Sequence, residues 1–522
     1  MQPWQSNPVV RLSFENGVTE MKEILELVIG KDEPIVTKKE FRVEEQCACL
    51  GIEHDVPLEY GFLMFLVIQD PLGNVRFQKQ LGCSEPMISI GSSAKDTTIG
   101  GVPGKIPMGI WSMNFYVFSE HIYEFLGNQT ALFHFYITDR SLPVTEVIGG
   151  PVWVGNTTAY DQFDYKRIYQ PESKWYKGDL HTHTRLSDGK ELPENASKKA
   201  NQMGLDYYIP TEHNVIHTGW SDTDVMILPG VEITTRLGHA NLFGIDKRPD
   251  AMDALLIHKE EALLKTDLLA VVKECRERNW LFSVNHPFLY VWKWLMDELP
   301  LEDINCLEII NDPTYAADPN AQADKANQKA VFLADALWED GYRICAVGGS
   351  DSHKEIDDFY EGANEPSIPG DPATWLYMDG LSPDHLLEAL RNCRCYVTRY
   401  CEVRSKFAAY GKEVCFGSQL DEKVSRFSYE LNFGGLTEEP VIFYIQDGEK
   451  HFCEDVRKLK DGSYDVSGEI NIQDKEYTWI RFGAQKRDGG FLFYGNPITR
   501  GKKQHQFKTF GQIRKYVEQQ WK

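Results

Sequence analysis

Hydrophobic and polar positions divide the chain into three regions that differ in the spacing of their apolar residues. Residues 1–170 contain short runs rich in β-branched and aromatic residues, such as YGFLMFLVI at 60–68 and ALFHFYIT at 131–138. Turn-forming Gly, Pro and Asp residues separate these runs at 70–74 and 100–109. This pattern predicts a β-sandwich. Residues 18–27 have helical spacing instead, so we expect the sandwich to carry one helix.

The middle region, residues 171–404, alternates apolar runs with amphipathic helical patterns. Apolar runs at 208–209, 281–284 and 344–347 follow helical patterns at 193–203, 261–278 and 322–339. Nearly continuous apolar strands that alternate with helices are typical of an α/β barrel, whose strands are buried on both faces.

The last region, residues 405–522, returns to strands and turns and ends in a short helical pattern near 510–520. We therefore expect an α/β protein in which a central barrel is flanked by an N-terminal β-rich domain and a C-terminal β-sandwich-like domain.

Charge and composition restrict the partners. Apolar residues make up 42% of the 522 positions, and the formal net charge is −23. A surface this negative repels nucleic acids and anionic membranes, so we expect neither as a partner and expect a small-molecule substrate instead. The sequence shows neither a signal peptide nor a run of apolar residues long enough to span a membrane, and its 11 cysteines follow no disulfide pattern. We expect a cytoplasmic protein, whose oligomeric state the sequence does not indicate.

Potential metal ligands follow several predicted strands of the middle region. They are His181, His183, Asp188, His213, Glu232, His239, His286, Asp351 and His353. Alternate residues of a strand point the same way, so His181 and His183 can hold one ion together. Ligands at the ends of several barrel strands converge on the C-terminal face. Imidazole and carboxylate ligands suit Zn²⁺, Mn²⁺ or Fe²⁺, and nine candidates suffice for two or three divalent ions.

Six short motifs in the middle region resemble, in order, those of the PHP (polymerase and histidinol phosphatase) superfamily. They are DLHTHTRLSDG at 179–189, TEHN at 211–214, PGVE at 229–232, GHAN at 238–241, NHP at 285–287 and GSDSH at 349–353. The flanking β domains make the whole chain similar to the CehA/McbA-type metallohydrolases of that superfamily. PMGIWS at 107–112 and the segments WIR at 479–481 and GNPI at 495–498 are similar to that subgroup's flanking domains.

The resemblance implies a distorted (β/α)7 TIM-like barrel with a di- or trinuclear metal centre. One ion would be held by His181, His183, Glu232 and Asp351. A second would share Glu232 and add His239 and His286. A third would use Asp188, His213 and His353. A metal-bridged hydroxide would then attack the substrate, and Asp351 or His353 would move protons to the leaving group. We expect Glu232 and Arg185 to take part in catalysis with them.

The bond that is cleaved stays open between two classes. The resemblance implies a phosphoester as the common substrate, and Arg185, Arg236 and Lys354 lie beside motif residues where they can meet phosphate oxygens. Members of the CehA/McbA group cleave aryl carbamates instead, so a carbamate, carboxyl ester or amide is the alternative. Aromatic residues near the motifs that could line an apolar pocket are Trp220, Phe288, Tyr290, Trp292 and Trp294.

Other residues near the motifs are expected to support the site, and two other functions are compared with hydrolysis. Glu308 and Asn311 lie at another strand end, where they can orient a ligand histidine, and His217 is expected at an exposed helix start. A carbohydrate- or protein-binding module with a vestigial site is the non-enzymatic alternative. A nucleic-acid-processing role conflicts with the negative charge.

Overall fold

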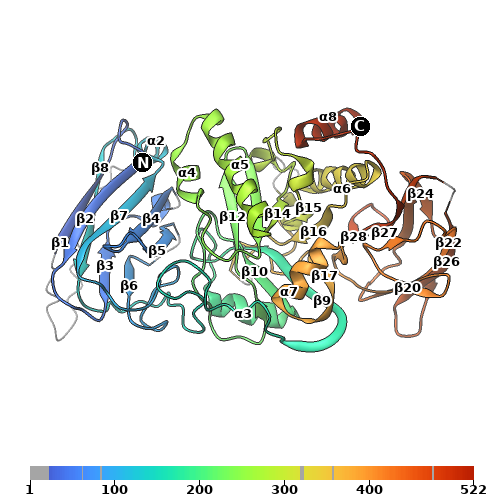
Figure 1. The fold of residues 1–522 in the computed structure, drawn as a ribbon, viewed down its shortest axis with the longest axis horizontal. Coiled ribbons are helices and arrows are strands. Elements are labelled where there is room, and N and C mark those ends of the chain that lie inside the picture. The colour runs from blue at the N-terminus through green and yellow to red at the C-terminus, as the bar shows by residue number, and fades with distance from the viewer. Residues whose placement is uncertain are drawn as a thin grey trace.

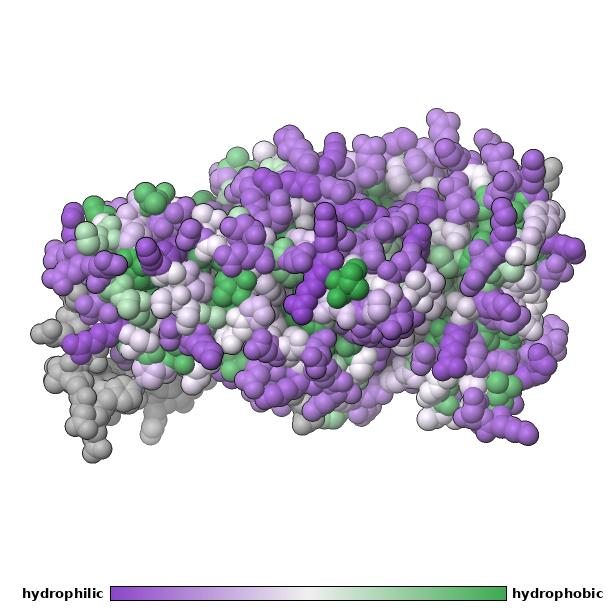
Figure 2. Space-filling model, turned by 60° about the horizontal axis from the view of Figure 1, so that its bottom comes forward, coloured by the Kyte–Doolittle hydropathy of each residue, from purple (hydrophilic) through white to green (hydrophobic). Residues whose placement is uncertain are grey.

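The computed structural model describes residues 23–521 except 62, 83–84, 318–322, 356–357 and 473–474. The molecule is elongated, with a β-rich N-terminal part, a central α/β part and a β-rich C-terminal part in a row (Figure 1). In the described residues no helix is long and apolar enough to cross a membrane. The face in Figure 2 is mostly hydrophilic, with hydrophobic side chains in small separate groups.

The N-terminal part consists of two four-stranded sheets that enclose one apolar core. One sheet has the order β1 (Glu23–Ile29), β8 (Ala131–Thr138), β3 (Leu50–His54) and β6 (Met87–Ile90), and the other has the order β2 (Val36–Val43), β7 (Gly109–Val117), β4 (Met64–Gln69) and β5 (Val75–Gln80). Two short helices, α1 (Leu58–Gly61) and α2 (Ser119–Phe125), lie between strands.

The helix expected at residues 18–27 is wrong for 23–27, which belong to β1, and residues 18–22 lie outside the described part. Leu25, Leu27 and Ile29 point into the core while Glu26 and Val28 are exposed. Apolar residues at every second position therefore bury one face of a strand, and this two-residue period decides the local structure.

The central part contains two sheets with helices between their strands. The first has the order β11 (Met226–Ile227), β10 (Tyr207–Pro210), β9 (Gln170–Thr182), β17 (Ala373–Leu381) and β18 (Cys395–Thr398). The second has the order β12 (Gly230–Thr235), β13 (Gly238–Phe243), β14 (Leu281–Val284), β15 (Cys306–Asn311) and β16 (Cys345–Gly349). The helices are α3 (Pro193–Gln202), α4 (Met252–Ile257), α5 (Glu261–Arg278), α6 (Ala323–Glu339) and α7 (Pro383–Arg391), with 3-10 turns at Tyr290–Trp292, Leu301–Asp303 and Pro313–Ala317.

The two central sheets approach each other where the candidate ligands lie. Single β-bridges join Thr182 to Ser352 and His213 to Glu232. The strand pairing between described residues does not close into one ring, and several neighbouring strands are antiparallel. The central fold is therefore mixed α/β, and the described strands of the expected distorted (β/α)7 barrel do not form a closed ring. Antiparallel pairs such as β12–β13 arise because a two-residue turn leaves no room for a crossover helix.

The C-terminal part continues the first central sheet. Strand β18 pairs with β28 (Phe491–Gly495), and the sheet goes on through β27 (Tyr477–Gln485), β23 (Val441–Gln446) and β24 (Glu449–Phe452). Off this path, β29 (Ile498–Gly501) pairs with β27, and β21 (Gln419–Leu420) pairs with β29. A separate five-stranded sheet has the order β20 (Lys412–Val414), β19 (Glu402–Ala409), β22 (Arg426–Gly434), β26 (Tyr464–Asn471) and β25 (Arg457–Lys458). The boundaries at residues 170 and 404 remain a prediction.

The last helix, α8 (Phe510–Gln520), returns to the central part (Figure 1). Thr509 and Gln512 form a capping box at its start, which satisfies free backbone N–H groups there. Its buried residues Phe510, Ile513 and Val517 belong to the central core. The central core is thus completed by the end of the chain.

The N-terminal sandwich packs directly against the loop that follows β9. The backbone N–H of Gln80 donates to the carbonyl of Leu186 over 3.1 Å. Leu186 is fully buried among Phe65, Val67 and Ile99 of the sandwich. The loop that carries Asp188 therefore rests on the N-terminal part.

Candidate metal centre

Strand ends of both central sheets bring the candidate ligands together. His181 is the second-last residue of β9, and His183 lies one residue beyond the strand. Glu232 is in β12 and His239 is in the paired strand β13, while His286 and Asp351 each follow the end of a strand by two residues. All nine residues predicted as metal ligands belong to sets whose ligand atoms lie within 4.8 Å of one another.

Glu232 is the hub of the cluster. Its Oε1 lies 3.3 Å from His181 Nε2, 3.2 Å from His239 Nδ1 and 3.5 Å from His286 Nε2. Its Oε2 lies 2.7 Å from His213 Nδ1. The carboxylate is completely buried. A buried carboxylate with basic groups on both oxygens is the arrangement that suits a bridging ligand.

A second group lies around Asp188. The Oδ1 atom of Asp188 is 3.5 Å from His213 Nε2 and 3.3 Å from His353 Nε2. His183 belongs to the same set, and its ring lies 4.1 Å from that of His353. The expected trio of Asp188, His213 and His353 is therefore brought together, with His183 added.

The other groupings differ in part from those that the resemblance implies. His181, His183 and Glu232 form one set, whereas Asp351 is grouped with His181 and His286. His239 is grouped with Glu232 and His213. Because Asp351 Oδ1 is nevertheless 3.2 Å from His181 Nε2 and 3.0 Å from His183 Nε2, the sets overlap in one continuous cluster.

The chemistry of these side chains fits divalent cations. Several buried atoms make no hydrogen bond among the described residues: His181 Nε2, both ring nitrogens of His183, His286 Nδ1 and Asp351 Oδ1. Buried polar atoms are normally hydrogen-bonded, and leaving one without a partner costs about 1–3 kcal/mol. Nitrogen and carboxylate donors in this mixture suit Zn²⁺, Mn²⁺ or Fe²⁺.

The electrostatics of the cluster couple its acids and bases. Burial opposes the charged form of His181, but Asp351, Glu308 and Glu232 raise its pKa well above the usual range. Burial likewise opposes ionisation of Glu232, yet His239, His181 and His213 bring its pKa well below the usual range. Burial and the neighbouring histidines lower the pKa of His183 to about 4. The carboxylates are thus held ionised and ready to accept positive charge.

Glu308 orients the cluster from behind, as expected. Its Oε1 lies 3.0 Å from His181 Nδ1, and its Oε2 accepts hydrogen bonds from the backbone N–H of His286 and from Asn311 Nδ2. Asn311 Nδ2 also donates to Asp351 Oδ2 over 3.2 Å. Contacts of this kind fix the tautomer and ring orientation of a ligand histidine.

Two further supporting residues were not singled out from the sequence. Asn285 Nδ2 donates to Glu232 Oε1 over 2.8 Å. Glu212 accepts hydrogen bonds from the backbone N–H groups of Thr184 and Ser187, which fixes the start of the loop that carries Asp188. Asn285 and Glu212 each stand next to a motif histidine, which is a signal that could have identified them.

Two cluster residues have strained backbones. Asp351 has φ of 50° and His286 has φ of 26°, in the left-handed region that non-glycine residues seldom adopt. Such conformations cost about 1–3 kcal/mol each and persist where the surrounding structure holds them. Both residues follow a strand end, so the strain turns their side chains toward the cluster.

The cluster opens into a cavity of about 370 Å³. Cluster residues form its floor, together with Asn311 and Asp312. Its walls are Lys190, Lys354, Leu289, Trp292, Tyr315 and Tyr360. The rings of Trp292, Tyr315 and Tyr360 meet edge to face, with centroids 5.9 Å and 5.1 Å apart. The cavity therefore combines an apolar wall with two lysines.

Asp312 is a buried carboxyl in this cavity that the sequence did not reveal. Burial raises its pKa to about 7, against an opposing hydrogen bond from Tyr360. Thr314 Oγ1 also donates to Asp312 Oδ1 over 2.8 Å. Asp312 follows Asn311 in the loop after β15 and belongs to none of the six sequence motifs.

Two of the three cationic residues expected to meet the substrate lie away from the cavity. Arg185, expected to be catalytic, directs Nη1 to Glu146 Oε1 over 3.3 Å and Nε to the carbonyl of Lys190. Arg236 is exposed and does not line the cavity. Lys354 does line it, with Nζ 4.9 Å from the ring of Tyr360.

The aromatic residues expected near the substrate also divide into one that lines the cavity and four that do not. Of the five expected to form a pocket, Trp292 lines the cavity. Trp220 and Trp294 are buried in the central core, where Trp220 stacks on Trp153. Phe288 packs against that core and Tyr290 is half exposed.

The expectation of an exposed His217 is wrong. The residue is buried, and its Nε2 lies 2.9 Å from Glu212 Oε1 and 3.1 Å from Thr184 Oγ1. Polar partners inside the fold compensate for the lost hydration of the ring. His217 thus supports Glu212 and, through it, the loop after β9.

Comparisons with known proteins give no family assignment. No family model and no curated protein matches the chain. A two-domain protein containing a predicted PHP-like metal-dependent phosphoesterase from Bacteroides vulgatus ATCC 8482 is similar to 64% of this chain over 99% of its own, at 15% identity and a TM-score of 0.33. An amidohydrolase from Chromobacterium violaceum, with bound sulfate and no metal, is similar to 35% of this chain over 89% of its own, at 14% identity and a TM-score of 0.23. These likenesses are too weak to carry an inference about fold or activity.

Proposed function

We propose that the protein is a metal-dependent hydrolase of small phosphoesters, with two or three divalent cations held by the nine clustered residues. The observation that carries the proposal is the convergence of these side chains on Glu232, with buried nitrogen and oxygen atoms that make no hydrogen bond. The order of the six sequence motifs, which resembles that of the PHP superfamily, supports it, and with it a distorted barrel as the underlying fold.

The chemistry divides between the cations and the chain. Divalent cations at this site would lower the pKa of water and neutralise charge on the reacting group. Glu308 and Asn285 hold His181 and Glu232 in orientation. Asp351 and His353 line the cavity, and we assign them the transfer of a proton to the leaving group.

Phosphoester specificity is supported by the charges around the cavity. Lys190 and Lys354 line it, and both can approach the oxygens of a bound phosphate. Arg185 lies outside the cavity wall and is tied to Glu146, so its proposed contact with substrate would require it to leave this partner.

A second candidate reaction is hydrolysis of an aryl carbamate, carboxyl ester or amide. The edge-to-face rings of Trp292, Tyr315 and Tyr360 favour it, because an aromatic wall accommodates a planar leaving group. The two reactions place different demands on the same cavity: the lysines serve the phosphoester and the rings serve the aryl group.

A substrate panel tests the proposal. Protein loaded with Mn²⁺ or Zn²⁺ is assayed on p-nitrophenyl phosphate, bis-p-nitrophenyl phosphate, naphthyl acetate and a naphthyl carbamate. We expect turnover of a phosphate ester that disappears in Glu232→Gln and persists in the matched variant Glu302→Gln, which changes an exposed glutamate. Turnover of the carbamate or acetate alone would favour the second candidate, and no turnover of any compound would refute both.

A further inference from the structure

A second and larger cavity, of about 740 Å³, lies between α6 and the C-terminal strands. Helix α6 contributes Asn327, Val331 and Asp335 to its wall. Strands β23, β27 and β28 and the adjoining turn contribute Phe443, Arg481, Lys486, Phe491 and Tyr494, and Trp521 borders it near the end of the chain. Figure 1 shows α6 beside β27 and β28, away from the N-terminal part. No residue of the metal cluster lines this cavity.

The two arginines of this cavity are already neutralised. Arg481 Nε and Nη2 each donate to a carboxylate oxygen of Asp335 over 2.6 Å, and Tyr494 donates to the same carboxylate over 3.2 Å. Arg399 pairs in the same forked manner with Asp371, over 2.7 Å for both contacts. Such bidentate pairs are strong and leave little net charge.

Two lysines on the same wall remain without a carboxylate. Lys450 Nζ lies 3.7 Å from the ring centroid of Phe443 and 3.3 Å from Gln485 Oε1. Lys486 Nζ lies 4.2 Å from the ring centroid of Tyr400. Within the described residues neither ammonium group forms an ion pair with a carboxylate, although the whole chain carries a net charge of −23. Partial burial and the nearby Arg481 lower the pKa of Lys450, and the carboxylate of Asp335 opposes this shift.

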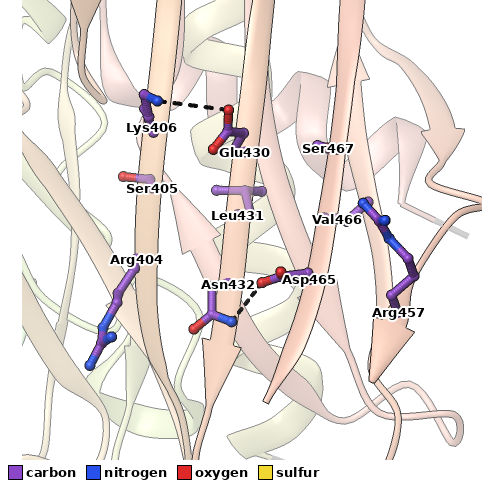
Figure 3. Close-up of a pocket in the computed structure, with 10 residues that line it drawn as sticks. All are labelled: Arg404, Ser405, Lys406, Glu430, Leu431, Asn432, Arg457, Asp465, Val466 and Ser467. Carbon is purple, nitrogen blue, oxygen red and sulfur yellow. Dashed lines mark hydrogen bonds and ion pairs between the residues drawn. The ribbon is translucent and has the colours of Figure 1, made fainter. Parts of the chain in front are cut away.

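The hollow on the outer C-terminal sheet has a different lining. Figure 3 shows two contacts between its polar side chains, one from β19 to β22 and one from β22 to β26. Lys406 pairs with Glu430 over 3.8 Å, and Asn432 donates to Asp465 over 2.6 Å. No aromatic ring lines it. This hollow therefore lacks an aromatic wall, whereas Lys450 and Lys486 line a cavity with aromatic walls.

We propose that the cavity between α6 and the C-terminal strands binds a small aromatic carboxylate. The carboxylate would accept charge-assisted hydrogen bonds from Lys450 and Lys486, and the ring would lie against Phe443, Tyr400 and Phe491. The cavity exceeds 300 Å³, the lower end of the range typical of small-molecule sites. This proposal does not depend on the hydrolytic function.

Isothermal titration calorimetry of the metal-loaded full chain with naphthoate tests this site. Naphthamide, which keeps the shape and lacks the charge, is the control ligand. The test variant is Lys450→Gln/Lys486→Gln, and its matched control is Lys406→Gln/Lys458→Gln, which removes two lysine charges outside this cavity. We expect one naphthoate per chain, and binding weaker by about tenfold or more in the test variant and for naphthamide.

Three results would overturn the proposal. Equal naphthoate affinity in the test variant would place the binding elsewhere, including at the metal cluster. Equal affinity for naphthamide would show that the lysines do not select an anion. No binding of naphthoate up to about 1 mM would show that the cavity does not take this class of ligand. A crystal structure with naphthoate beside Lys450 would support the assignment directly.

Discussion

The Nδ1 atom of His181 lies 3.0 Å from Oε1 of Glu308, on the far side of the ring from the centre of the cluster. A carboxylate at this position holds the proton on Nδ1. Nε2 is then the ring nitrogen left to bind a metal, and it lies 3.3 Å from Glu232 and 3.2 Å from Asp351. A residue that would touch neither metal nor substrate thus prepares His181 to act as a ligand.

Replacing Glu308 by Gln is expected to weaken metal binding about 10- to 100-fold. The amide nitrogen would stand either against His181 Nδ1 or against the two donors that share Oε2, the backbone N–H of His286 and Asn311 Nδ2. One or two of the three hydrogen bonds would therefore be lost. Metal affinity is measured by competition with a coloured chelator. Glu302→Gln, at an exposed glutamate, is the control, and an unchanged affinity in Glu308→Gln would remove the orienting role.

Glu232→Gln is expected to lower the metal content by more than one equivalent. Glu232 belongs to two sets, one with His181 and His183 and the other with His213 and His239, so the neutral amide would weaken two positions at once. Elemental analysis after gel filtration measures this. The loss of a single equivalent would assign Glu232 to one ion and contradict a bridging role.

The N-terminal sandwich contains a buried ion pair between Lys79 and Glu146, with exposed fractions of 1% and 0%. Lys79→Met is expected to lower the free energy of unfolding by about 3 kcal/mol, because it leaves Glu146 buried with less compensation. The control Lys38→Met removes an exposed pair with Glu40 and should cost less than about 1 kcal/mol. Urea unfolding compares the two, and equal effects would mean that burial of the first pair is unimportant.

His54 gives the sandwich a dependence on pH that is separate from the metal centre. Burial and the nearby Lys79 lower the pKa of His54 to about 4. The unfolded chain binds this proton near pH 6.5, so stability is complete above that pH and is lost as pH falls toward 4. The loss attributable to His54 reaches about 3 kcal/mol at pH 4.

His54→Phe should therefore make the unfolding free energy less dependent on pH between 6.5 and 4. Phenylalanine can pack against Phe135 as the histidine ring does, at a centroid distance of 5.6 Å in the native protein. Urea titrations at several pH values measure the slope. If the variant and the native protein lose stability in parallel, the titration of His54 is not responsible.

Local sequence patterns predicted which side chains cluster better than they predicted the surroundings of the cluster. His181, Asp351 and their partners stand at strand ends, where period and turn signals limit the direction of a side chain. The helix expected across residues 23–27 was wrong because alternating leucines, which bury one face of a strand, also fit a short helical spacing.

Contacts between segments that are far apart in the sequence could not be predicted from local patterns. Arg185 is diverted from the cavity by Glu146, a partner in the N-terminal sandwich. Tyr315 and Tyr360 reach the cavity from loops without a periodic pattern, whereas Trp220 and Trp294, close to motifs in sequence, are buried in the core. Proximity along the chain therefore did not predict which aromatic residues face the site.

The metal content of the protein tests the central claim most directly. Protein purified without chelator, or reconstituted with Zn²⁺, Mn²⁺ or Fe²⁺ and then freed of excess ion, is examined by elemental analysis. The geometry of the nine clustered residues predicts two or three equivalents of divalent metal per chain. Less than about one equivalent, not restored by any of the three ions, would contradict the account.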